Sequence, residues 1–290
     1  TKKAPAPAAK DPAPGAPGKQ AAPTGSSKDA SPVGALTLPP PPPGYTPAPA
    51  PAPSAGVGTL GRRVALVIGN AAYRLGPLQN PVNDAEAMAK TLRQDLKFDK
   101  VILKKDVTAE GFRAALREFA REVVGAGLGL VYYAGHGTEV GGKNFLIPVD
   151  AQLAKSGDLD LEAIALDTVV AQLAGVTTLK LVILDACRNN VFALAGAQRQ
   201  GRGRGLARVD NTDESTLVFY AAKDGTTADD GLGRKHSPFT AALLKHIVTP
   251  GLELRFLLGE VRDDVMTSTG RQQQPHWYGT FGRTRIFLRR

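Results

Sequence analysis

The hydrophobic positions after residue 62 follow two alternating patterns. Short, continuously apolar runs predict strands buried on both faces, while apolar residues three or four positions apart predict amphipathic helices. The predicted strands are 63–69, 100–104, 128–133, 180–184, 216–221 and 285–288. The predicted helices are 81–96, one beginning at 108, 166–174, and two beginning near 237 and 252. This alternation predicts an α/β fold with a mainly parallel sheet covered by helices.

The first 60 residues lack both patterns. They hold 16 of the 22 prolines of the chain, and Tyr45 is their only aromatic residue. A segment of this composition cannot bury enough apolar surface to offset the entropy of ordering it, so we expect a disordered tail or linker at 1–60. Residues 61–290 are then expected to form a single domain, which is long enough for a sizeable core.

Charge and cysteine content narrow the classes of partner. The tail has five Lys against two Asp, which leaves about +6 of the net charge of +9 for the domain. The basic residues are scattered there except in one loop, so no nucleic-acid binding is expected. No apolar run approaches the roughly 18 residues that a membrane span needs. The single cysteine, Cys187, excludes an internal disulfide.

Two of the predicted strands end at residues that can do chemistry. The strand 128–133 runs into a Gly-His-Gly sequence centred on His136, and the strand 180–184 is followed by Asp185 and Cys187. Ligands of open α/β sheets bind beyond the carboxyl ends of the strands, and parallel strands bring these ends to one edge. We therefore expect His136 and Cys187 to meet at this edge.

A cysteine beside a histidine is suited to nucleophilic catalysis. An unperturbed thiol has a pKa of about 8.5, and an adjacent imidazole supplies the base that raises its reactivity. Gly137 has no side chain to obstruct its N–H, which with the N–H of Cys187 could stabilise an oxyanion. A lone cysteine after a buried strand is more often a small apolar core residue. The two residues at equivalent strand ends favour catalysis over that explanation.

The surroundings of this pair resemble the caspase and metacaspase clan of cysteine peptidases, most of all the bacterial metacaspase-like proteins called orthocaspases. His136 precedes Cys187 by 51 residues, close to the spacing of about 50 in the caspase signature. The resemblance runs from about residue 63 to the C-terminus. It also takes in Ile68-Gly69-Asn70-x-x-Tyr73, Asn83-Asp84-Ala85 and Ser237-Pro238-Phe239. It implies an α/β/α sandwich with a mainly parallel six-stranded sheet, and a cysteine endopeptidase that acts through an acyl-enzyme.

The departures from the caspase signature bear on specificity. Asp185 stands where the signature has Gln, and Asn189 stands where it has Gly. The resemblance to metacaspases implies cleavage after Arg or Lys, with Asp84 and Asp185 at the acidic positions that bind the basic side chain. Two simpler explanations stay open at this point. Asp84 falls in the first helical turn, where the helix dipole favours a carboxylate, and Asp185 could accept backbone hydrogen bonds in a turn.

Cofactors are not expected. Several metacaspases require calcium, but the stretch 189–200, which follows the nucleophile, contains no acid. The other acids and histidines with possible roles are Asp224, Asp229, Asp230, His236, His246 and His276. We expect the three acids to form a solvated turn and the three histidines to be structural or exposed, without metal-ligand spacing.

The basic segment 199–208 follows the candidate nucleophile. Its Gly-Arg repeats favour either a flexible solvated connection or a site of self-processing by an Arg-specific enzyme. The expected partners are protein or peptide substrates. A rival function is a catalytically silent caspase-fold interaction module tethered by the proline-rich tail. The resemblance implies a monomer. The start at Thr1 and the Ala-Pro-rich tail favour an exported or periplasmic bacterial protein over a cytoplasmic one.

Overall fold

The computed structural model describes residues 1, 60–74, 76–187, 215–223 and 228–290. At Cys187 this description covers the main chain but not the side chain. The predicted tail at 1–60 and the basic segment 199–208 therefore lie outside the described residues, apart from the two residues Thr1 and Leu60.

The described residues are built around a sheet whose main path has the order β2-β1-β3-β6-β7-β8. β1 pairs in parallel with β2 and β3, β3 with β6, and β6 with β7, whereas β8 is antiparallel to β7. The strands are β1 (Arg63–Gly69), β2 (Lys100–Lys105), β3 (Leu128–Val140), β6 (Leu179–Cys187), β7 (Thr216–Tyr220) and β8 (His276–Gly279). Two short strands, β4 (Lys143–Leu146) and β5 (Ile164–Ala165), extend the end of β3 by antiparallel pairing.

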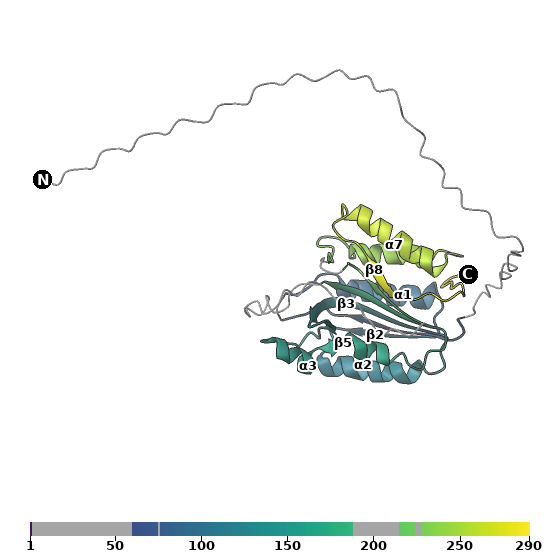
Figure 1. Cartoon of the computed structure of the whole chain (residues 1–290), viewed down its shortest axis with the longest axis horizontal. Helices are drawn as coiled ribbons and strands as arrows, with labels where there is room; N and C mark the ends of the chain where they lie inside the picture. The colour runs from purple at the N-terminus through teal and green to yellow at the C-terminus, as the bar shows by residue number, and fades with distance from the viewer. Residues whose placement is uncertain (2–59, 75, 188–214, 224–227) are drawn as a thin grey trace, which may run out of the picture. The chain divides into compact units, whose positions relative to one another are not determined.

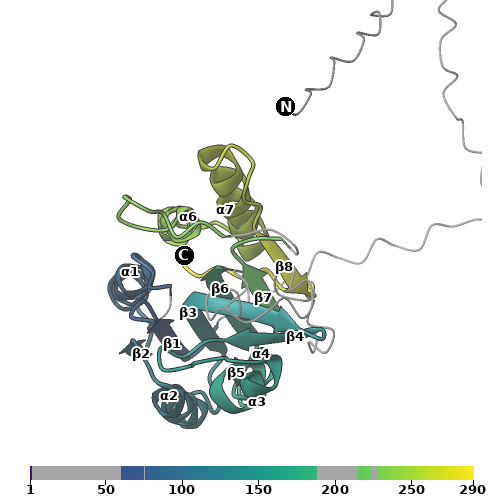
Figure 2. The ribbon, with the colours of Figure 1, turned by 90° about the vertical axis from the view of Figure 1, so that its left-hand side faces the viewer.

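Helices cover both faces of this sheet (Figures 1 and 2). One face carries α1 (Pro81–Gln94), α6 (Pro238–His246) and α7 (Leu254–Ser268). The other carries α2 (Ala109–Glu122), α3 (Leu159–Glu162), which follows the 3₁₀ turn Ser156–Asp158, and α4 (Leu166–Ala171). The predicted α/β sandwich with a mainly parallel sheet is confirmed.

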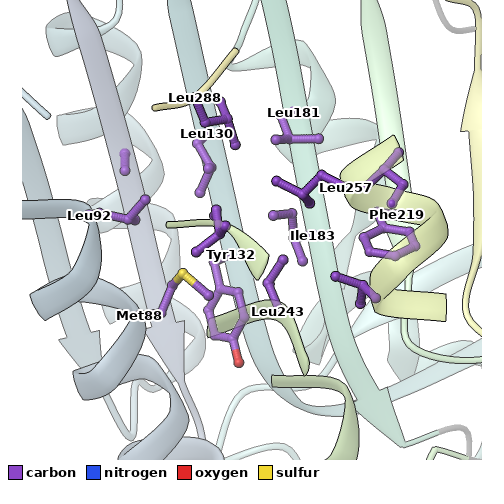
Figure 3. Close-up of a cluster of buried hydrophobic side chains, with 14 of the residues drawn as sticks. Met88, Leu92, Leu130, Tyr132, Leu181, Ile183, Phe219, Leu243, Leu257 and Leu288 are labelled. Atoms are coloured by element: carbon purple, nitrogen blue, oxygen red, sulfur yellow. The ribbon is translucent and has the colours of Figure 1, made fainter. Parts of the chain in front are cut away.

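The central strands are buried on both faces, which is why they appear in the sequence as unbroken apolar runs. Alternate residues of β3 and β6, including Tyr132 and Ile183, pack against α1, α6 and α7 (Figure 3). The residues between them, including Tyr133 and Leu184, pack against α2 and α4. Burial of each such side chain contributes about 1.5–3 kcal/mol, so two extensive cores hold the carboxyl ends of β3 and β6 in place.

One predicted strand is wrong. The sixth strand of the main path is β8 at His276–Gly279, not the segment 285–288. In that segment Phe287 forms only an isolated bridge with Glu253, and Leu254 N–H donates to the carbonyl of Ile286 at 2.9 Å. Leu288 and Ile286 pack into the core on the face of the sheet that carries α1, α6 and α7, so the hydrophobicity of this segment comes from packing onto the sheet and not from a place within it.

Candidate active site

The two candidate catalytic residues lie opposite each other on neighbouring strands. β3 and β6 are in parallel register from Leu128 and Leu179 up to His136 and Cys187, whose Cα atoms are paired. Neighbouring strands lie about 4.8 Å apart. The sequence placed both residues just after their strands, whereas the structure keeps them within β3 and β6, which are longer than predicted. A rigid sheet, not a loop, therefore holds this pair of positions.

The His136 imidazole is buried, with only 2% of the residue exposed, and its two nitrogens differ. Nε2 lies 2.7 Å from the carbonyl oxygen of Gly76. A carbonyl only accepts, so Nε2 carries the proton of the neutral ring and Nδ1 carries the lone pair. Nδ1 has no hydrogen-bond partner among the described atoms. Burial lowers the pKa of His136, which keeps the ring neutral and able to accept a proton at Nδ1.

The N–H of Gly137 is directed toward the end of β6, where Cys187 lies. Gly137 is the register partner of Leu146 in β4, and the N–H of Ile147 donates to the carbonyl of His136 at 3.1 Å. In an antiparallel ladder this pattern makes Gly137 and Leu146 a non-hydrogen-bonded pair, whose N–H groups point away from the partner strand. The Gly137 N–H therefore faces the edge of β3 that pairs with β6, where Cys187 ends the strand.

Asp185 is buried next to the start of α6. Its Oδ2 accepts hydrogen bonds from the hydroxyls of Ser237 and Thr240, each at 2.5 Å. The Ser237 hydroxyl also caps α6 by accepting from Thr240 N–H at 2.9 Å. The sequence left open the explanation that Asp185 accepts backbone hydrogen bonds in a turn. In the structure Asp185 lies in β6, and the donors to its Oδ2 are side-chain hydroxyls.

Asp84 also points toward the start of α6. Its Oδ1 lies 2.7 Å from Nδ1 of His236, and its Oδ2 accepts from Ser237 N–H at 3.3 Å. Only 1% of Asp84 is exposed. The helix-dipole explanation for Asp84 is therefore incomplete, since the carboxylate reaches α6 and meets Asp185 at their common partner Ser237.

Asp230 is a third acid in this region, and the sequence assigned it to a solvated turn. The structure places it against the start of α1, where its carboxylate accepts from Gln79 N–H at 2.7 Å and Asn80 N–H at 3.3 Å. The Asn80 side chain donates to the carbonyls of Asp230 and Gly231. We call Asp84, Asp185 and Asp230 the acidic cluster. Of the other two loop acids, Asp229 is exposed and Asp224 lies outside the described residues.

Burial controls the protonation of the acidic cluster. It is the largest cause raising the pKa of Asp84 to about 9 and that of Asp185 to about 6, and it also raises the pKa of Asp230. The charge of Asp185 adds to the shift of Asp84. Two buried carboxyls that repel each other in this way share a proton near neutral pH. The cluster therefore carries less negative charge than its three acids suggest.

This proton makes the stability of the fold depend on pH. The folded protein keeps it at pH values where an unfolded Asp, with a pKa of about 3.9, has lost it. The contribution of this proton to the free energy of unfolding is thus fully present below about pH 4. It falls as the pH rises toward the folded pKa, by up to about 1.4 kcal/mol per pH unit. Replacement of Asp84 by Asn removes the group. We expect urea titrations at pH 5 to 8 to show a flatter decline for Asp84→Asn than for the wild type, and parallel curves would contradict the shared proton.

The remaining histidines have different surroundings. His236, expected to be structural or exposed, is the partner of Asp84, and burial lowers its pKa. His246 bonds Asp264 at 2.7 Å, and His276 packs against Trp277 and Tyr278. The described residues contain no group of three or more His, Cys, Asp or Glu side chains placed to hold a metal ion. None of the described helices is long and apolar enough to cross a membrane.

Fold and site together define a caspase-type domain. A family model described as the caspase domain matches residues 62–285, so the chain belongs to this family of cysteine peptidases. Over 90 residues, 31% of the chain, it is 44% identical to the human (Homo sapiens) mucosa-associated lymphoid tissue lymphoma translocation protein 1. The Mus musculus homolog of that protein is 42% identical over the same length. The match spans only 11% of each relative. The predicted membership of the caspase clan is confirmed.

Proposed function

We propose that the chain is a cysteine endopeptidase that cleaves after Arg or Lys, with Cys187 as nucleophile and His136 as base. The observation that carries this proposal is the state of His136. Its ring is buried and neutral, Nε2 is bound to the Gly76 carbonyl, and Nδ1 is left without a described partner at the position paired with Cys187. A lone pair buried in this way costs free energy, which a catalytic role for Nδ1 explains.

The proposed reaction follows from these positions. The Cys187 thiol gives its proton to Nδ1 of His136, and the sulfur attacks the carbonyl carbon of the substrate. The N–H groups of Gly137 and Cys187 stabilise the oxyanion. His136 then protonates the leaving amine as the C–N bond breaks. Water, deprotonated by His136, attacks the acyl-enzyme and releases the carboxylic acid product and the free thiol.

The acidic cluster accounts for the proposed preference. An Arg or Lys side chain would bring one positive charge to Asp84 and Asp185 and take the place of the shared proton. Each charge-assisted hydrogen bond to a guanidinium contributes about 1.5–3 kcal/mol. An Asp side chain would instead be repelled by the carboxylates. The expected substrates are therefore proteins or peptides with a basic residue before the cut bond.

The test is cleavage of short peptides that carry Arg, Lys or Asp ahead of a fluorogenic leaving group. We expect kcat/KM for the Arg and Lys peptides to exceed that for the Asp peptide by about a hundredfold or more, since two charge-assisted contacts are lost with Asp. A preference for Asp would overturn the specificity and leave the Cys-His pair intact. No cleavage of any of the three would favour the silent interaction module.

The same preference would make the segment 199–208 a substrate of the enzyme itself. This segment has Arg at several positions and lies outside the described residues. We expect wild-type protein to show fragments cut within it on a denaturing gel, and Cys187→Ala protein to remain whole. Identical banding of the two preparations would rule out self-processing. We propose that the protein is a monomer, and light scattering of the uncut chain tests this.

A further inference from the structure

We propose that Tyr73 is a positioning residue for His136, acting through the main-chain N–H of the histidine. This inference rests on the proposed function, because it assigns Tyr73 a part in presenting the catalytic base. β3 extends beyond the end of its neighbour β1. β1 ends at Gly69, and Asn70 N–H donates to the carbonyl of Ala134 at 2.9 Å. The next residue of β3 that faces this edge is His136, beyond the end of β1.

Two tyrosine hydroxyls occupy the edge at that point. The Tyr73 hydroxyl accepts from His136 N–H at 2.9 Å, and the Tyr133 hydroxyl donates to His136 O at 2.8 Å. The two hydroxyl oxygens are 3.1 Å apart, and each lies within hydrogen-bond distance of the carbonyl of Ile147. All of these hydrogen bonds are buried. Together with the Ile147 N–H, which donates to the His136 carbonyl, these side chains take the place of β1 and fix the peptide groups of His136.

The residue before the histidine fits this arrangement. Gly135 has φ +153°, and a Cβ at this position would lie 2.5 Å from the Tyr73 hydroxyl and 2.7 Å from the Tyr133 hydroxyl. Any side chain there would push the hydroxyls out of contact with His136. The glycine in the Gly-His-Gly sequence is therefore needed for the hydroxyl pair, apart from any role in catalysis.

Tyr73 also holds the ring of His136. The two ring centroids are 4.4 Å apart at an angle of 46°. Tyr73 belongs to the same short segment as Gly76, whose carbonyl fixes Nε2 of the imidazole. The start of this segment is anchored by Asp106, whose carboxylate accepts from Ala71 N–H at 2.7 Å and Ala72 N–H at 2.9 Å. The segment that carries Tyr73 and Gly76 therefore contacts His136 at its main-chain N–H, at the face of its ring and at its proton-bearing nitrogen.

The two tyrosines are not equivalent. The recorded acceptor for the His136 N–H is the Tyr73 hydroxyl, so its removal leaves a buried donor unsatisfied. The His136 carbonyl accepts from Ile147 N–H at 3.1 Å as well as from Tyr133, so it keeps a partner when the Tyr133 hydroxyl is removed. Loss of the Tyr73 hydroxyl should therefore displace His136 more than loss of the Tyr133 hydroxyl.

The kinetic test compares Tyr73→Phe and Tyr133→Phe, with Phe119→Leu as a destabilising control in α2. Phe119 is fully buried on the opposite face of the sheet from α1. With active sites titrated by a thiol reagent, we expect Tyr73→Phe to lower kcat about 10- to 100-fold at nearly constant KM, the scale of a misplaced catalytic group. Tyr133→Phe should lose clearly less. Equal losses in the two tyrosine variants, or a Tyr73→Phe loss no larger than that of Phe119→Leu, would overturn the proposal.

A second measurement does not depend on peptidase activity. In the Cys187→Ala protein, ¹⁵N NMR reports the tautomer of His136 and hydrogen exchange reports its amide. We expect Tyr73→Phe to accelerate exchange of the His136 amide about tenfold or more, because its bond partner is gone, and to weaken the preference for a proton on Nε2. An unchanged amide and tautomer would overturn the positioning role. If Tyr73→Phe has these effects but the wild-type protein cleaves no peptide, the proposed function is overturned and the positioning role of Tyr73 is not.

Discussion

Replacement of His136 by Ala is expected to lower kcat/KM for an Arg peptide by about a thousandfold or more, within the range attributed to general acid–base catalysis. The variant removes the Nδ1 lone pair, which is buried, has no hydrogen-bond partner among the described atoms and is the proposed acceptor of the thiol proton. Replacement of Cys187 by Ala should cost at least as much, since no acyl-enzyme can then form.

The two losses should not add. Residues that act as one unit lose most of the rate when either is removed, so the double variant should be no slower than the slower single variant. His246→Ala is a control for the loss of a histidine outside the site, because the His246 ring is half-buried and bonds Asp264 between α6 and α7. Steady-state cleavage measures all four variants. Activity that survives Cys187→Ala would contradict the mechanism.

The strands and helices that could be predicted are those whose periodicity comes from the two cores. β1, β3 and β6 are central and buried on both faces, so they leave unbroken apolar runs. β4 and β5 are short strands at the end of β3 and carry no such run. β8 lies at the edge with all four residues half-buried, so neither alternation nor continuous burial marks it. Edge strands of this kind depend on tertiary pairing, which periodicity does not encode.

The candidate site also has residues that the sequence predicts and contacts that it does not. His136, Cys187 and Asp185 follow directly from strand ends, because parallel strands deliver their carboxyl termini to one edge. The partner of Asp84 is His236, 152 positions along the chain, and Asp230 contacts the start of α1 from a similar distance. Tyr73 had appeared in the resemblance, but its hydroxyl contact with the His136 main chain depends on where β1 ends. Contacts between loops so far apart leave no local pattern in the sequence.

Replacement of Asp185 by Asn should lower kcat/KM for Arg and Lys peptides about 10- to 150-fold, the equivalent of one charge-assisted hydrogen bond of about 1.5–3 kcal/mol. Asn keeps the size of the side chain and an oxygen that can accept from Ser237 and Thr240, so the site is expected to stay packed. The loss should appear mainly with basic substrates, because an uncharged residue before the cut bond makes no contact with the carboxylate.

Stability separates a substrate-binding role for Asp185 from a structural one. Because burial raises the pKa of Asp185, its ionised form is costly in the folded protein. Asn should therefore leave the free energy of unfolding unchanged or raise it while activity falls. Asp99→Asn is the matched control: its carboxylate accepts from Arg63 N–H at the opposite end of β1, and it carries the same change of charge. Urea unfolding and peptide kinetics on both variants distinguish the substrate-binding role of Asp185 from a structural one. If Asp185→Asn lost stability and activity together while Asp99→Asn lost neither, Asp185 would hold α6 against β6 and would have no separate part in choosing the substrate.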